Sequence, residues 1–150
     1  MTLEERLVLE NQILQKDGLS QFQVYRSQYG ESFFLSGIHR TSGGNSYTIW
    51  SPIPVLYPSR RPPVYVLEPN PLWGFRNEKK INSYGTVSHY MHTLENGQNG
   101  EVQICHWRDD RWHSGITLNK VMIKVVLWLE AYEQHLSSGD PISAFLGTMQ

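Results

Sequence analysis

The stretch LNKVMIKVVLWLEAYEQHLSSG, residues 118–139, decides the fold class. Its apolar residues recur at the spacing of one helix face: Leu118, Val121, Met122, Val125, Leu129, Tyr132 and Leu136. Val126, Leu127 and Trp128 widen this stripe, so we expect a largely buried helix that lies across a sheet. Gly139 and Pro141 are typical of the residues that follow a helix end.

The segment before this helix has the period of β-strands. Phe22 and Val24 alternate with glutamines, and Tyr47 and Ile49 alternate with small polar residues. Turn residues separate the candidate strands, which are 21–27, 32–40, 46–51 and 64–67. Because the first three are joined by short connections, the sequence predicts a four-stranded antiparallel meander.

The N-terminus reads as a further helix. Thr2 and Glu5 have the spacing of a capping box, Leu3 and Leu7 begin an apolar face, and Asp17-Gly18 is a stop signal. A helix, a meander and a core helix predict an α+β fold. At 150 residues, we expect one domain over residues 1–150.

Composition excludes several classes of partner. Lys and Arg number 13 against 14 Asp and Glu, so the formal net charge of −1 indicates no binding to nucleic acid or to an anionic membrane. The run Val125–Leu129 is far shorter than the ~20 residues that span a bilayer. The single cysteine, Cys105, excludes an internal disulfide, and the start of the chain lacks a signal segment. We therefore expect a soluble cytoplasmic protein.

Residues 68–100 show no period and are interrupted by prolines and glycines. An irregular stretch of this length in a compact domain is typically functional or disordered. Cys105 comes soon after it, in Val102-Gln103-Ile104-Cys105, where its parity differs from that of Val102 and Ile104. In an extended segment this parity predicts a thiol that points away from the core. The alternative is a small apolar core residue, the commoner fate of a lone cysteine.

Two other kinds of cysteine site stay open. A cysteine hydrolase needs a histidine base, and the candidates are His89, His92, His106 and His113. No papain-type or caspase-type signature surrounds Cys105. A zinc site could combine Cys105 with His89, His92 and His113, but the paired cysteines of structural zinc sites and the deaminase pattern are absent from the sequence. We expect no metal and no cofactor.

One segment carries a family motif: Tyr57-Pro58-Ser59-Arg60-Arg61-Pro62-Pro63-Val64. Cys105 follows it, then Trp112, then Thr117-Leu118 at the start of the core helix. With one residue inserted, this layout resembles the ubiquitin-conjugating enzyme superfamily, whose pattern is Tyr-Pro-x-x-Pro-Pro. The segment Trp128–Glu133 with Gly139 is similar to the prokaryotic branch, whose members accompany cyclic-oligonucleotide synthases in antiphage (CBASS) operons.

The resemblance implies a thioester-forming enzyme with Cys105 as the acyl carrier. The partners it implies are a protein that ends in glycine, either a cyclic-oligonucleotide synthase or a ubiquitin-like protein, and an activating enzyme. The product would be an adduct on a lysine or another amine. The family's His-Pro-Asn, whose asparagine stabilises the oxyanion, has no counterpart among residues 89–93.

Transfer between thiols does not require a strongly activated cysteine, but aminolysis benefits from a donor and a carboxylate near the thioester. For these roles we nominate His89, His92, Asp109 and Asp110. The two aspartates also fit an ordinary solvated turn. The rival function is a non-catalytic binding module of the same fold, in which the cysteine is incidental.

Other residues have structural interpretations. Tyr57, Pro58, Pro62 and Pro63 set a rigid path into the fourth strand. We expect Trp112 to pack under the cysteine loop, Trp128 and Tyr132 to lie in the core, and Trp73 or Trp107 to be available to a partner. On the first helix, Arg6, Gln12 and Lys16 predict a solvated face, which by family analogy would contact an activating enzyme.

Overall fold

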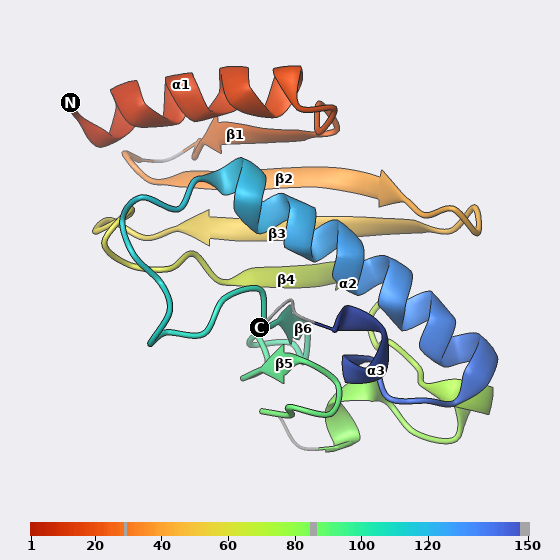
Figure 1. Ribbon diagram of the computed structural model, residues 1–150. Coiled ribbons are helices and arrows are strands. Elements are labelled where there is room, and N and C mark those ends of the chain that lie inside the picture. The colour runs from red at the N-terminus through yellow and green to blue at the C-terminus, as the bar shows by residue number, and fades with distance from the viewer. Residues whose placement is uncertain (29, 85–86, 148–150) are drawn as a thin grey trace.

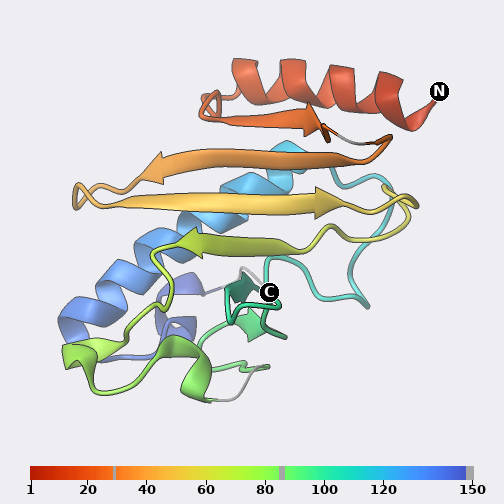
Figure 2. The same cartoon turned by 180° about the vertical axis from the view of Figure 1, so that it is seen from behind.

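A computed structural model describes residues 1–28, 30–84 and 87–147. Helix α1 (Leu3–Lys16) lies along one edge of an antiparallel sheet, and helix α2 (Leu118–Ser138) crosses one face of that sheet (Figure 1). Seen from behind, strands β1 to β4 lie in front of α2 (Figure 2). The predicted α+β arrangement is therefore confirmed: an N-terminal helix, an antiparallel sheet and C-terminal helices.

The predicted meander forms the larger part of the sheet. Its strands are β1 (Phe22–Arg26), β2 (Phe33–Arg40), β3 (Ser46–Ile53) and β4 (Val64–Glu68). Two short strands, β5 (Thr93–Leu94) and β6 (Val102–Ile104), extend it. Over the described residues the order is β1-β2-β3-β4-β6-β5, so the sheet has six strands and not the predicted four. The two additional strands are too short to show a period in the sequence.

The stretch predicted to be irregular is only partly so. Besides β5 it contains two 3-10 helices, η1 (Phe75–Asn77) and η2 (Ile81–Tyr84). A short helix α3 (Ser143–Leu146), which the sequence did not predict, follows α2. Within the described ranges, no helix is both long enough and apolar enough to cross a membrane.

Both long helices begin and end near the predicted residues. The Thr2 hydroxyl accepts from the Glu5 amide at 3.1 Å, and the Glu5 carboxylate accepts from the Thr2 amide at 3.3 Å. This reciprocal pair is the predicted capping box. Helix α2 ends where Gly139 takes φ of 82°, a left-handed conformation that glycine adopts without a steric penalty.

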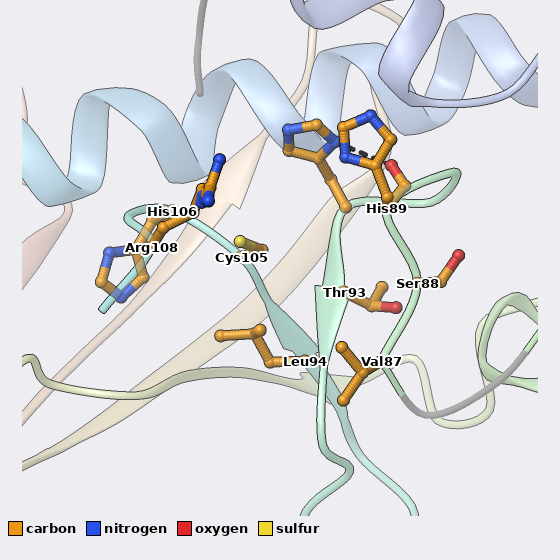
Figure 3. Close-up of a pocket in the computed structure, with 9 residues that line it drawn as sticks. Val87, Ser88, His89, Thr93, Leu94, Cys105, His106 and Arg108 are labelled. Atoms are coloured by element: carbon orange, nitrogen blue, oxygen red, sulfur yellow. Dashed lines mark hydrogen bonds between the residues drawn. The ribbon is translucent and has the colours of Figure 1, made fainter. Parts of the chain in front are cut away.

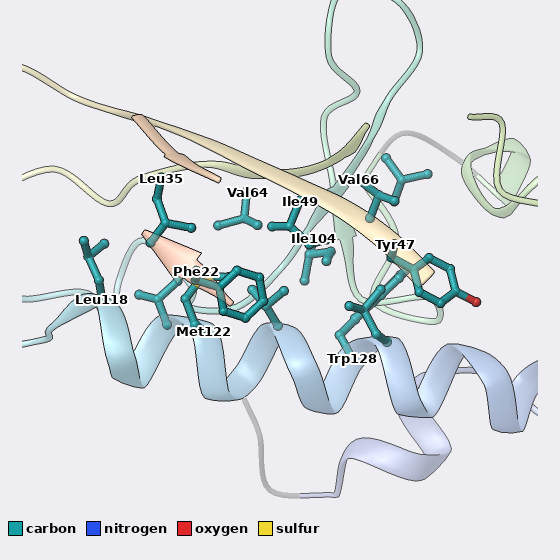
Figure 4. Close-up of a cluster of buried hydrophobic side chains, with 14 of the residues drawn as sticks. Phe22, Leu35, Tyr47, Ile49, Val64, Val66, Ile104, Leu118, Met122 and Trp128 are labelled. Carbon is teal, nitrogen blue, oxygen red and sulfur yellow. The ribbon is translucent and has the colours of Figure 1, made fainter. Parts of the chain in front are cut away.

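The core lies between α2 and the sheet. Met122 and Trp128 of α2 face Phe22, Leu35 and Ile49 of the strands (Figure 4), and all five side chains are fully buried. The predicted width of the apolar stripe is wrong at one position. Leu127 is 49% exposed, because it lies on the side of α2 away from the sheet, in a groove shared with α3.

A buried carboxylate joins three segments near the start of α2. Glu10, only 3% exposed, accepts hydrogen bonds from the Tyr57 hydroxyl at 2.7 and 2.8 Å and from the Leu118 amide at 2.5 Å. Arg6 completes the group with a 2.8 Å ion pair to Glu10. In the described chain, Thr117 makes no side-chain cap, so the glutamate of α1 satisfies the first amide of α2 instead.

These contacts correct one prediction and refine another. Arg6 does not belong to a freely solvated face, because its guanidinium also donates to the Ser114 carbonyl at 3.1 Å and packs over the Tyr57 ring. Gln12 and Lys16 are exposed, as predicted. Tyr57 serves the scaffold, as predicted, although it does so through its hydroxyl as well as its place in the proline-rich segment.

Candidate active site

Cys105 directly follows β6 and is fixed through its backbone. Its amide donates to the His92 carbonyl at 2.9 Å, which extends the pairing of β5 with β6 by one residue. The indole N–H of Trp128 donates to the Met91 and His92 carbonyls at 3.0 and 3.1 Å. Trp128, a core residue of α2, therefore fixes the backbone of residues 91–92, to which the Cys105 amide is bonded.

A cavity of about 230 Å³ opens beside the thiol. Figure 3 shows the side chains around it, which come from the segment before β5, from β5 itself and from the segment after β6: Val87, Ser88, His89, His92, Thr93, Leu94, Cys105, His106 and Arg108. The structure thus brings three predicted site residues, Cys105, His89 and His92, to one cavity.

The thiol is half-buried, whereas the alternation of residues 102–105 predicted an exposed one. The prediction fails because all three residues of β6 are buried, so successive side chains of this strand do not alternate between core and solvent. Burial raises the pKa of Cys105, and Asp109 adds to this effect, while Arg61, Arg108 and Lys124 act in the opposite direction. The thiol is mainly protonated at neutral pH, and the cavity gives access to it.

His92 is a buried, neutral imidazole. Its Nδ1 lies 3.2 Å from the His89 carbonyl, and because a carbonyl only accepts, Nδ1 carries the proton. Burial lowers the pKa of His92, so Nε2 keeps a lone pair at neutral pH. The residue has φ of 52°, a strained conformation that recurs at functional sites. His89 is exposed, with its ring centroid 5.5 Å from that of His92.

His106 links the cysteine loop to the proline-rich segment. Its Nε2 donates to the Pro62 carbonyl at 2.7 Å, and burial lowers its pKa to about 3, so it stays neutral. Its Nδ1 is buried and has no hydrogen-bond partner among the described residues. Trp112 packs edge-on against His106 and donates to the Pro58 carbonyl at 2.8 Å, which confirms its predicted place under the loop.

The two nominated carboxylates lie at the surface. Asp110 is 3.1 Å from a guanidinium nitrogen of Arg108, and Asp109 is 3.0 Å from Nε of Arg61. Both aspartate side chains are more than half exposed. Asp110 is not among the described residues that line the cavity, although its partner Arg108 is.

The sequence did not point to Arg61 or Lys124 as residues near the thiol, and both act on its pKa. Arg61 donates to the Trp107 carbonyl at 2.7 Å, and the ammonium nitrogen of Lys124 lies 3.3 Å from the centre of the Trp107 ring. Trp107 is thus held from two sides and is only partly exposed, whereas Trp73 is 42% exposed. The four-residue spacing of Lys124 and Trp128 was the available signal, since such residues share a helix face.

The structure does not bring the residues of the alternative zinc site together among the described residues. In the described part of the chain, no group of three or more His, Cys, Asp or Glu side chains could hold a metal ion. His113, the fourth residue of that set, is exposed, and its Nδ1 accepts from the Gly115 amide at 3.1 Å.

Comparisons with known proteins give a distant structural likeness. The sequence matches no protein-family model, and no curated protein matches it. Among solved structures, it is similar to human ubiquitin-conjugating enzyme E2 G1, with 18% identity and a TM-score of 0.47 over 88% of this chain and 92% of that one. A likeness at this level assigns no activity.

Proposed function

We propose that this protein is a thioester-forming conjugating enzyme that carries an acyl group on Cys105. The observation that supports this most is the placement of the thiol, which is held by its own backbone at an open cavity beside a neutral histidine. A thiol that accepts and releases an acyl group needs access and a fixed position more than a permanently ionised state.

The first step is acyl transfer onto Cys105. The sulfur, as thiolate, attacks the carbonyl carbon of an activated C-terminal glycine, and the bond from that carbon to the activating group breaks. The thiol proton leaves to solvent. Because burial raises the pKa of Cys105, the thiolate is a minor species at neutral pH, and we expect this step to accelerate as the pH rises.

The second step is aminolysis. A neutral amine attacks the thioester carbonyl, an oxyanion forms, the C–S bond breaks and an amide bond forms. The amine must also lose a proton, and we propose Nε2 of His92 as its acceptor, because Nδ1 is already protonated toward the His89 carbonyl. His89 is then a positioning residue for His92, and Asp110 is a positioning residue for Arg108 at the cavity.

The substrate class follows from the resemblance. We propose that the donor is the C-terminal glycine of a cyclic-oligonucleotide synthase or a ubiquitin-like protein, delivered by an activating enzyme. The setting we propose is bacterial antiphage defence in the cytoplasm.

Replacement of Cys105 by serine tests the proposal. With a glycine-terminated donor, its activating enzyme and ATP, the unaltered protein should form an adduct that thiol reductants cleave. The Cys105→Ser variant should form an oxyester that resists reductant but is cleaved by hydroxide, and Cys105→Ala should form neither. Denaturing gels and intact-mass measurements read the result. An adduct that survives reductant in the unaltered protein, or one that forms on Cys105→Ala, contradicts the thioester mechanism.

The second candidate is a non-catalytic binding module, which the missing His-Pro-Asn favours. Alkylation separates the two functions, because Cys105 is the only cysteine in the chain. We expect native protein at pH 8 to react with iodoacetamide within about tenfold of the rate of denatured protein. Labelling that requires denaturation would favour the module.

A further inference from the structure

A second cavity, of about 500 Å³, lies on the outer face of the sheet, the face turned away from α2 (Figure 2). Ile49 and Val66 belong to the core between the sheet and α2. Side chains alternate between the two faces of a strand, so the neighbours of these two residues point outward. Four of the outward residues of β3 and β4 line the cavity: Trp50, Pro52, Tyr65 and Leu67.

Two aromatic rings form the floor of this cavity. Trp50 and Tyr65 are directly opposite in the pairing of β3 with β4, their ring centroids are 5.9 Å apart, and the ring planes are tilted by 31°. Both side chains are partly exposed. An exposed ring face attracts a cation, and the apolar side chains of Pro52 and Leu67 can cover an aliphatic stem. The floor therefore suits a cation at the end of an apolar chain.

A carboxylate stands at the wall of the cavity. Oε1 of Glu101 accepts from the Asn99 amide at 2.8 Å, which fixes the group in place. An ionised carboxylate has about four acceptor positions, so it can bond to a ligand as well. The turn that carries Glu101 is closed by a 2.9 Å bond from the Gly97 amide to the Glu101 carbonyl, and the Asn70 side chain donates to the Asn99 carbonyl at 3.1 Å. The wall is thus formed before any ligand binds.

The charge around the cavity is negative. Among the described residues that line it, Glu101 is the only charged one. Burial raises the pKa of Tyr65, Glu101 and Glu95 raise it further, and Arg61 acts in the opposite direction. Arg61 is already paired with Asp109 at 3.0 Å. The two glutamates therefore leave negative charge beside the rings that a cationic ligand can neutralise.

We propose that this cavity binds an arginine side chain of a partner protein. The planar guanidinium stacks on the Trp50 ring and donates to the Glu101 carboxylate. Arginine fits better than lysine, because its guanidinium presents five donors in one plane and is more weakly hydrated than an ammonium group. None of the described residues that line this cavity also lines the cavity at Cys105, so the binding goes beyond the proposed conjugating function and does not depend on it.

Titration with a short arginine peptide, followed by ¹⁵N NMR of the indole N–H groups, tests the binding. The chain has five tryptophans, and Trp50→Phe identifies the signal of Trp50. Acetyl-Gly-Arg-Gly-amide should shift that signal saturably, with a Kd of about 1 mM. The citrulline peptide has the same shape without the charge and should bind about tenfold more weakly. The lysine peptide should bind about threefold more weakly than the arginine peptide.

Glu101→Gln removes the charge at the wall but keeps an acceptor for the Asn99 amide, and it should weaken binding of the arginine peptide about tenfold. Glu68→Gln is the matched control, because Glu68 is an exposed residue of β4 outside the cavity lining, and binding should stay within about twofold. Tyr65→Leu removes one ring face and should weaken binding about fivefold. Thermal unfolding checks the fold of each variant, and the two glutamate variants decide the result if Tyr65→Leu is unfolded.

Three results would overturn the proposal: no saturation by about 10 mM arginine peptide, equal binding of the citrulline peptide, or equal losses in Glu101→Gln and Glu68→Gln. Lysine peptide that binds as tightly as arginine peptide would overturn the choice of arginine. The titrations use no donor protein and no thioester, so they are independent of the test at Cys105. Arginine binding by a protein that never forms a thioester would support this site and contradict the conjugating function.

Discussion

Replacing Glu10 with alanine should lower the free energy of unfolding by about 3 to 5 kcal/mol. The carboxylate is 3% exposed and accepts from Arg6, from the Tyr57 hydroxyl and from the Leu118 amide. Its removal leaves a part-buried guanidinium without its ion pair and two buried donors without an acceptor. Each unsatisfied neutral donor costs about 1 to 3 kcal/mol, so the loss is much larger than that of a surface ion pair.

Urea denaturation monitored by tryptophan fluorescence and by circular dichroism measures this loss. In a chain of this size, 3 kcal/mol corresponds to a fall in Tm of about 10 °C. Glu78→Ala removes an exposed glutamate and should change stability by no more than about 0.5 kcal/mol. A Glu10→Ala protein within 1 kcal/mol of the unaltered one would show that the buried carboxylate contributes little.

The sequence predicts the parts of the fold that have a long period and local signals. Helix α2 spans six turns of apolar spacing before Gly139, and α1 begins at a capping box, so both are found within a residue or two of their observed ends. The first four strands each have at least five residues, and turn residues separate the first three.

What the sequence does not show depends on contacts between distant segments. Strands β5 and β6 have two and three residues. Strand β6 pairs with β4, which is remote in the chain, and β5 is held by pairing with β6. The same pairing buries all of β6, which is why alternation gives the wrong exposure for the thiol. Glu10 is an ordinary helix residue until Tyr57 and Leu118, 47 and 108 positions away, close around it.

The residues of the candidate site likewise fall into those that stand out in the sequence and those that only the fold brings together. Cys105 stands out because it is a lone cysteine after an irregular stretch, and His89 and His92 stand out by composition. Lys124 and Arg61 are typical surface residues in the sequence, and only the fold brings both to Trp107. Asp110 is the reverse case, since its neighbours in the sequence suggested a site and the structure places it on the surface beside Arg108.

If His92 accepts the proton in aminolysis, His92→Asn should slow transfer from preformed thioester to lysine by about 100-fold, a typical loss for a general base. Asparagine suits this position because it tolerates the positive φ of 52° better than other residues with a side chain. Formation of the thioester should change by less than about threefold, because thiol transfer does not need the base. Single-turnover assays of the two steps measure this separation.

The pH dependence gives a second, independent measure of the same role. Burial lowers the pKa of His92, so Nε2 stays unprotonated through the neutral range and becomes protonated only below the ordinary histidine pKa of about 6.5. The unaltered protein should therefore lose aminolysis more steeply on acidification than His92→Asn, which has no such group to titrate. His113→Asn alters an exposed histidine outside the cavity lining and should stay within about twofold at every pH. Equal slopes for His92→Asn and the unaltered protein would assign the proton to solvent and leave His92 a positioning residue for the Cys105 loop.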